Sequence, residues 1–215
     1  MMETASKERI LKNIRKGLIQ TTDQPFPNLD TSTSVYPAPV DSLDVIFAEQ
    51  FTRVQGNFVY CENEEDFIDH LTALADEKQW NNIFAWEYFL QQMLQRNAFM
   101  RLSVGNNLDK ADAGITLCEW LVARTGSIVV SSRQMAGRSL TIYPPVHLVV
   151  AFNTQLVYDI KEALQGVTEK YNGTLPSMIS IATGPSRTAD IEKTLVLGAH
   201  GPKEVYLFFV DQPGV

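Results

Sequence analysis

Two kinds of hydrophobic periodicity alternate along the chain from residue 41 onward. Apolar residues recur every three or four positions in some stretches, which predicts helices at 42–56, 63–79, 87–97 and 154–171. Short and nearly continuous apolar runs predict buried strands at 57–61, 82–86, 99–104, 127–132, 147–152, 177–183 and 205–211. This alternation predicts an α/β fold, with a mostly parallel sheet that has helices on both faces. In such sheets ligands bind beyond the carboxyl ends of strands, at helix N-termini.

The first 40 residues follow a different pattern. Apolar residues within 10–19 are separated by charged ones at helical spacing, which predicts a short amphipathic helix. Residues 21–40 lose this period and contain four prolines, so they predict an extended tether. We expect an arm and tether at 1–40 and one α/β domain at 41–215. The arm is expected to dock on its own domain or on a neighbouring copy of the chain. Docking on a neighbouring copy would make a homo-oligomer. The alternative is a helix that lies on a membrane surface.

Charge and cysteine content narrow the class of protein. The 215 residues include 18 Lys and Arg against 25 Asp and Glu, a net charge of -7, and no basic cluster that would favour nucleic-acid binding. Cys61 and Cys118 are too few for a disulfide framework, a zinc finger or an iron–sulfur cluster of the chain's own. Charges interrupt the N-terminus where a signal peptide needs apolar residues, and no run reaches the roughly 20 residues that span a bilayer. These features predict a cytoplasmic protein with no cofactor and no membrane span.

The stretch SIATGPSRTAD, residues 180–190, has the pattern of a strand, a tight turn and a helix start. Gly184 allows the turn, Ser186 or Thr188 can cap the helix, and Asp190 falls in its first turn. A cation at the positive end of a helix is unfavourable unless it pairs with an acid or an anion shares the site, so Arg187 needs an explanation. Two interpretations remain open: a structural corner, and a site for an anion or carboxylate.

Two further turns supply candidate groups. The Thr125, Gly126 and Ser127 turn offers amides and hydroxyls, and the turn before the final apolar run places His200 near Lys203. A turn histidine can titrate near neutrality and act as an acid, base or ligand donor, or simply bond to the backbone. We expect Arg187, Asp190 and His200 to line one accessible pocket with the 125–127 turn.

Other polar groups favour structural roles. His147, after a double proline, is expected to be a hydrogen-bonded core histidine. A metal site from His70, His147 and His200 is not expected, because no two share a ligand spacing. The segment ITLCEWLVA suggests a helix with Cys118 as an inert buried thiol, and with Glu119 as an exposed helix residue or, alternatively, a carboxylate in a cleft.

Three sequence blocks resemble a known family. They are AGITLCEWLVARTGSIVV at 113–130, YPPVHLVVAF at 143–152 and GPSRTADIEKTLVLGAHGPKE at 184–204, and together they resemble the lactate-utilisation protein C family of the wider LUD domain group. The general organisation of arm and tether is also similar. The matching positions are Thr125, Gly126, Pro144, Pro145, His147, Gly184, Pro185, Ser186, Arg187, Thr188, Ala189, Asp190, Glu192, His200, Gly201, Pro202 and Lys203.

The resemblance implies a NagB/RpiA/CoA-transferase-like fold and a role in bacterial oxidation of L-lactate to pyruvate. It also implies partner proteins that carry iron–sulfur clusters, whereas the C component has no cluster motif. The sequence departs from the family pattern in two places: Arg124 stands where an acidic residue is common, and Leu117, Cys118 and Glu119 stand where a Gly-Ala-Asp run is common. These departures concern the chemistry of the site and leave the expected fold unchanged.

Two function classes follow, with a third and plainer alternative. The first is a non-redox component of a lactate-oxidising system that binds a small carboxylate or assists its iron–sulfur partners, with Arg187 as the clamp and His200 as a proton donor. The second is a stand-alone enzyme that acts on a CoA ester or a phosphorylated metabolite through the same turns. The third is an interaction scaffold with an empty cleft.

Overall fold

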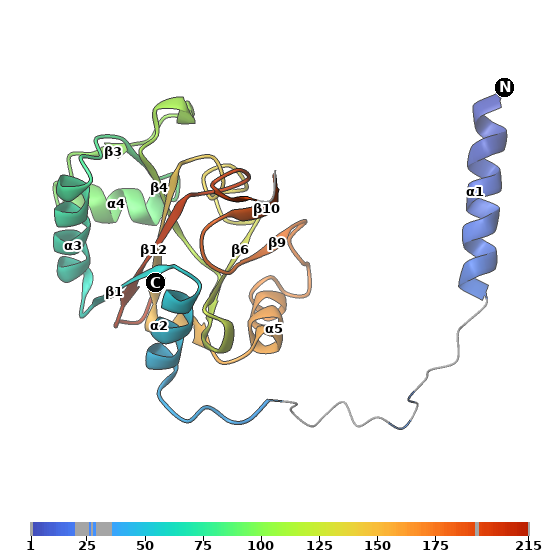
Figure 1. The fold of residues 1–215 in the computed structure, drawn as a ribbon, viewed down its shortest axis with the longest axis horizontal. Coiled ribbons are helices and arrows are strands. Elements are labelled where there is room, and N and C mark those ends of the chain that lie inside the picture. Colours follow the sequence, from blue (N-terminus) through green and yellow to red (C-terminus); the bar gives the residue numbers. More distant parts are fainter. Residues whose placement is uncertain (1, 20–25, 27, 29–35, 192–193, 215) are drawn as a thin grey trace. The chain divides into compact units, whose positions relative to one another are not determined.

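A computed structural model of the chain describes residues 2–19, 26, 28, 36–191 and 194–214. The chain divides into two compact units, Met1–Ala38 and Pro39–Val215. The first unit contains the helix α1 (Met2–Ile19), as the apolar spacing predicts, and it leaves apolar side chains such as Ile14 and Leu18 exposed (Figure 1). Most of the expected tether, at 21–25, 27 and 29–35, lies outside the described residues.

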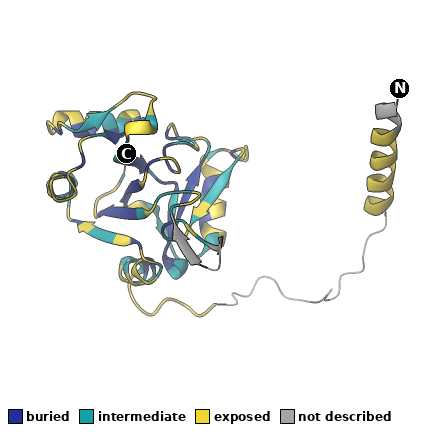
Figure 2. Ribbon diagram, turned by 45° about the horizontal axis from the view of Figure 1, so that its top comes forward, coloured by how far each residue is buried: buried dark blue, intermediate teal, exposed yellow. Residues whose placement is uncertain are grey.

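A six-stranded, entirely parallel sheet forms the centre of the second unit (Figure 1). Its spatial order is β1 (Asn57–Cys61), β12 (Glu204–Val210), β7 (Val146–Phe152), β4 (Ala113–Leu117), β2 (Ile83–Phe84) and β3 (Leu102–Ser103). β7 is buried along its whole length and β12 from Val205 onward, which is why their apolar runs are nearly continuous (Figure 2). The predicted mostly parallel α/β sheet is confirmed.

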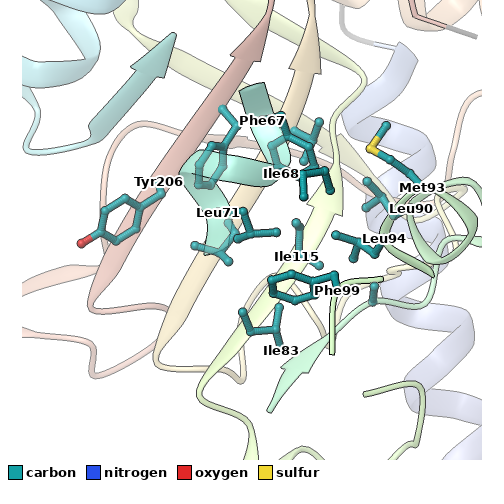
Figure 3. Close-up of a cluster of buried hydrophobic side chains, with 14 of the residues drawn as sticks. Phe67, Ile68, Leu71, Ile83, Leu90, Met93, Leu94, Phe99, Ile115 and Tyr206 are labelled. Carbon is teal, nitrogen blue, oxygen red and sulfur yellow. The ribbon is translucent and has the colours of Figure 1, made fainter. Parts of the chain in front are cut away.

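The first face of this sheet is covered by two helices. α3 (Glu64–Glu77) and α4 (Tyr88–Arg96) bury apolar side chains against the strands. Figure 3 shows Phe67 and Leu71 of α3 and Leu94 of α4 packed around Ile115 of β4. Asn63 caps α3, because its side chain accepts a hydrogen bond from the Asp66 amide at 3.0 Å.

The second face is covered by α2 (Leu43–Arg53) and by a second, four-stranded sheet. The order of that sheet is β8 (Leu156–Val157), β5 (Trp120–Val122), β6 (Ser127–Ser131) and β9 (Ile179–Ala182). α5 (Ile160–Lys170) packs on the outer side of this sheet, with Ala163 and Val167 against Val122 and Val129. Short 3₁₀ turns lie at η1 (Leu108–Lys110), η2 (Ala123–Thr125) and η3 (Asn153–Gln155).

Three expectations about local structure were wrong. ITLCEWLVA forms the end of β4, a turn and β5, because its β-branched residues pair with neighbouring strands. The helix expected after Gly184 is instead the antiparallel pair β10 (Arg187–Ile191) and β11 (Thr194–Leu197). The helix expected over 154–171 begins only at Ile160, because Asp159 caps it and β8 precedes it.

Candidate functional site

The structure has a cavity of about 440 Å³ at the carboxyl ends of the central strands β4 and β7. The start of α4 and the end of α5 complete its walls. The cavity is lined by Glu87, Phe89, Leu117, Cys118, Glu119, Trp120, Gln134, Phe152, Thr154, Gln155, Lys170, Tyr171 and Gly214. The carboxyl ends of parallel strands are where α/β sheets bind their ligands, so this cavity is the candidate site.

Glu87 is buried at the N-cap of α4, where the chain leaves β2. Its Oε2 accepts a hydrogen bond from the Leu117 amide at 2.8 Å, which ties the start of α4 to the end of β4. Burial raises the pKa of Glu87 to about 7, even though the Leu117 amide favours the charged form. The neighbouring Glu119 charge raises the pKa further. Glu87 can therefore gain or lose a proton near neutral pH.

Glu119 is buried in the turn between β4 and β5, and its surroundings keep it ionised. Its carboxylate accepts hydrogen bonds from Lys170 Nζ at 2.7 Å, Tyr171 Oη at 2.7 Å and Ser131 Oγ at 2.5 Å. Burial alone would raise the pKa of Glu119, but these three donors outweigh it and hold the pKa below its usual range. Glu119 is thus a buried carboxylate, and the expectation of an exposed helix residue was wrong.

Two carboxyl groups with different protonation states therefore share one cavity. Such a pair can supply a proton donor or acceptor beside a fixed negative charge. Lys170 is half-exposed and uses one donor on Glu119, and an ammonium group has three donors in all. Cys118 also lines the cavity, but burial raises the pKa of its thiol, as expected for an inert buried cysteine.

The residues predicted from the glycine turns lie elsewhere, near the amino ends of the central strands. The Thr125 and Ser127 hydroxyls are 2.7 Å apart, and Ser127 Oγ lies 2.8 Å from Thr183 Oγ1. Gly126 is left-handed, with φ 59°, and a Cβ there would collide with the backbone of α2 at Phe51. This turn is therefore fixed by close packing of the backbone against α2.

The second predicted turn packs on the same helix end. Gly184 has φ 77°, as its position in a tight turn predicts, and a Cβ on it would collide with the Val54 carbonyl oxygen. The exposed Arg187 donates a hydrogen bond to that same carbonyl. Thr188 pairs with Val196 in the β10–β11 ladder. The side chain of Asp190 lies outside the described residues, as does Glu192.

The loop that carries His200 adjoins this turn. The Ser186 amide donates to the Pro202 carbonyl at 2.9 Å, and the Gly198 amide donates to the Ser186 carbonyl at 3.0 Å. The Lys203 amide donates to Pro145, directly before β7, and the His200 side chain is exposed. The structure therefore places the 125–127 turn and the Gly184 turn against the end of α2, with the His200 loop beside the Gly184 turn. The role of these turns in ligand binding stays a prediction.

Two other residues singled out in the sequence have structural partners. His147 is buried on β7 with Nε2 2.9 Å from Thr116 Oγ1, which confirms a hydrogen-bonded core histidine; burial lowers its pKa to about 4. Arg124 forms an ion pair with Asp159, the N-cap residue of α5, at 2.7 Å. The three residues that depart from the family pattern at Leu117, Cys118 and Glu119 all line the cavity.

Sequence reasoning missed Glu87, Lys170 and Tyr171 as cavity residues. The partners of Glu119 are 12, 51 and 52 positions away in the chain, so no local spacing connects them. One usable signal was Glu119 itself, for which a carboxylate in a cleft was the alternative interpretation. A second was the expectation of ligand binding at the carboxyl ends of parallel strands and at helix N-termini, because Glu87 occupies such a helix start.

Sequence comparison finds relatives among the lactate-utilisation proteins. The family model described as the LUD domain matches residues 45–210. Lactate utilization protein C of Bacillus subtilis is 36% identical over 171 residues, which cover 76% of this chain and 67% of that protein. The protein of the same name from Shouchella clausii is 28% identical over 189 residues, 81% of each chain.

A solved structure shares the fold. A DUF162 family protein from Deinococcus radiodurans superposes with a TM-score of 0.59 at 18% identity, covering 78% of this chain and 96% of that chain. Among the described residues, no helix is long and apolar enough to cross a bilayer.

Proposed function

Because the chain belongs to the LUD domain family, we propose that it is a non-redox component of a bacterial L-lactate utilisation system and binds a small anionic metabolite. Relatives that cover most of the chain carry the name lactate utilization protein C. The chain has two cysteines, Cys61 and Cys118, which are too few to hold an iron–sulfur cluster of its own. The redox step then belongs to partner proteins, and a cytoplasmic location is part of the proposal.

One observation supports the binding role. The cavity at the carboxyl edge contains Glu87, whose pKa is raised to about 7, together with the ionised Glu119 and its ammonium partner Lys170. The remaining donors of Lys170 suit the carboxylate of a hydroxy or oxo acid. Glu87 can donate a hydrogen bond to the hydroxyl or carbonyl oxygen of the same acid while it is protonated. The volume of about 440 Å³ also admits anions larger than lactate.

The sharpest test compares variants at the two edges of the sheet. Thermal-shift measurements with lactate, pyruvate, CoA and sugar phosphates detect any ligand that binds the native state, because binding raises the apparent stability by mass action. We expect lactate or pyruvate to stabilise the wild type and Arg187→Ala, but to bind Lys170→Met at least tenfold less tightly, because that variant lacks the ammonium group proposed to bind the ligand carboxylate. If Lys170→Met responds like the wild type, the cavity is not the binding site.

The turns at the amino edge favour a second candidate function, a stand-alone enzyme for a CoA ester or a phosphorylated metabolite. Arg187, His200 and Lys203 are cationic or ionisable groups in adjoining loops, which suits a phosphate. In the same screen, stabilisation by CoA or sugar phosphate that disappears in Arg187→Ala would favour this function. A chain that responds to no ligand in either variant series is better described as a scaffold.

The partner part of the proposal concerns the iron–sulfur lactate-utilisation proteins and α1. The exposed side chains of Ile14 and Leu18 give this helix an apolar stripe that can dock on a partner or on a second copy. We expect Ile14→Asp with Leu18→Asp to weaken co-purification with the iron–sulfur proteins or to lower the oligomeric state, measured by light scattering. A matched control, Lys12→Asp with Lys16→Asp, changes charge on the same helix and leaves the stripe intact.

A further inference from the structure

Three side chains with metal-binding atoms converge at the carboxyl end of β1, away from the cavity. Cys61 is the last residue of β1 and is buried, Asp66 lies in the first turn of α3, and His70 lies one turn later. Cys61 Sγ is 3.7 Å from His70 Nδ1, and Asp66 Oδ1 is 3.5 Å from the same nitrogen. All three ligand atoms lie within 4.8 Å of one another.

The arrangement differs from that of a catalytic triad. In a triad the nucleophile bonds to one imidazole nitrogen and the carboxylate to the other, so that the ring relays a proton. Here the thiol and the carboxylate both approach Nδ1, so the ring cannot lie between them. Three different donor atoms that meet at one point are the arrangement of a chelate.

The spacing suits zinc. With bonds of about 2.3 Å to sulfur, 2.0 Å to nitrogen and 2.1 Å to oxygen, a tetrahedral ion separates sulfur from nitrogen by about 3.5 Å and nitrogen from oxygen by about 3.4 Å. The two observed separations, 3.7 Å and 3.5 Å, are close to these values. We propose that Cys61, Asp66 and His70 form a zinc-binding site with three protein ligands and a fourth position for water or an exogenous ligand.

Neighbouring groups support a cation at this place. Asp66 Oδ2 accepts a hydrogen bond from the Glu62 amide at 3.0 Å, which orients the carboxylate with Oδ1 toward His70. Glu62, Glu65 and Asp69 line the same surface hollow as Asp66, so the local field attracts cations. His70 is exposed, so an ion can enter from solvent.

Binding exchanges a proton for the metal. When the sulfur–metal bond forms, the thiol proton passes to solvent and the thiolate becomes the ligand.

Titration of the full-length, metal-free protein with Co²⁺ alone tests the site. We expect a thiolate-to-cobalt charge-transfer band and visible bands of tetrahedral intensity at one equivalent, both displaced by Zn²⁺. The matched control is Cys118→Ser, which removes the other buried cysteine and keeps the spectrum. Cys61→Ser is expected to abolish the charge-transfer band, and His70→Ala to weaken Co²⁺ binding at least tenfold.

The exposed position of His70 keeps the test decisive, because His70→Ala removes a ligand without opening the core, whereas Cys61 is buried. Circular dichroism of each variant serves as the control that the fold is kept. No charge-transfer band in the wild type, or equal Co²⁺ affinity in wild type and His70→Ala, would overturn the proposal. The ligands are not cavity residues, so this result is independent of the lactate-binding test.

Discussion

The two ends of the central strands hold polar groups of opposite kinds. At the carboxyl ends, Glu87 and Glu119 are buried beside a cavity, and their pKa values are shifted in opposite directions. At the amino ends, Arg187 and His200 are exposed on adjoining turns, and Gly184 in the first of these turns touches the end of α2. Close packing accounts for the glycine turns, whereas burying a carboxyl group costs free energy that packing does not require. The comparison therefore directs the search for chemistry to the carboxyl edge.

The largest expected effect tests whether the amino-edge turns are structural. Gly184→Ala should lower the free energy of unfolding by about 4 kcal/mol, because the new Cβ meets the Val54 carbonyl oxygen in addition to the cost of a left-handed backbone. Gly173→Ala is the matched control: φ is 78° and the site is open, so a loss of about 1 kcal/mol is expected. Urea unfolding measures both, and equal losses would contradict the packing argument.

The next effect concerns the carboxyl edge and depends on pH. The pKa of Glu87 is about 7 in the folded protein against a usual value of 4.5. Between these two pH values Glu87 is mainly protonated in the native state and mainly ionised in the unfolded state. Stability should therefore fall as the pH rises through this window, by about 3 kcal/mol in total. Glu87→Gln cannot ionise, and its side-chain oxygen can still accept from the Leu117 amide.

The variant should consequently match the wild type near the lower end of this window and exceed it in stability by up to about 3 kcal/mol above the upper end. Urea unfolding at a series of pH values measures the difference. A difference that does not change with pH would mean that Glu87 titrates at its ordinary value in the folded protein.

A smaller effect is expected from the partner of Glu119. Lys170→Met removes the ammonium group and leaves a buried carboxylate with donors from Ser131 and Tyr171. Breaking a fully buried ion pair would lower the free energy of unfolding more strongly. Because Lys170 is half-exposed and water screens the pair, we expect this free energy to fall by about 1–2 kcal/mol near neutral pH. The pKa of Glu119 should also rise, which carbon NMR of the carboxyl group can follow.

The control for this variant is Lys161→Met, on the exposed first turn of the same helix. We expect it to change stability by less than about 0.5 kcal/mol. If both lysine variants behave alike, the bond between Lys170 and Glu119 contributes nothing to folding.

The smallest effect is expected at His200. Its side chain is exposed, so His200→Ala should change the free energy of unfolding by less than about 0.5 kcal/mol. Arg187→Ala should cost about 1 kcal/mol, since its guanidinium bonds to the Val54 carbonyl. A stable His200→Ala protein that no longer supports growth on lactate would restore the amino edge as a functional site.

Local pattern predicted the central strands β1, β2, β3, β7 and β12 and the positions of the helices, but it did not predict β4 or the partners of each strand. The continuous apolar runs at β7 and β12 predicted buried parallel strands, because each strand is covered on both faces. Gly184 was correctly placed in a tight turn. The helix predicted after it failed because Ser, Thr and Asp favour helix caps and turns equally, while Ile191 and Val196 favour a strand.

The general rule that parallel strands direct ligands to their carboxyl ends points to the cavity, but it did not select the cavity residues. The site residues predicted from the glycine turns lie near the opposite ends of the strands. Glu119 was expected to be exposed because its segment was taken for a helix, and its partners Lys170 and Tyr171 reach it only through the packing of α5 beside the second sheet. Burial and pKa shifts of this kind arise from tertiary contacts, which no local period encodes.

The strand order has a consequence for biosynthesis. β1 has β12 as its neighbour in the sheet, and the two are separated by most of the domain, so a nascent chain emerging from the ribosome holds β1 without its pairing partner until residues 204–210 appear. Until then the apolar edges of β1 and β7 stay open, which is the state that chaperones recognise. We therefore expect completion of this sheet to follow translation of β12, and a stalled chain lacking it to depend on a holdase.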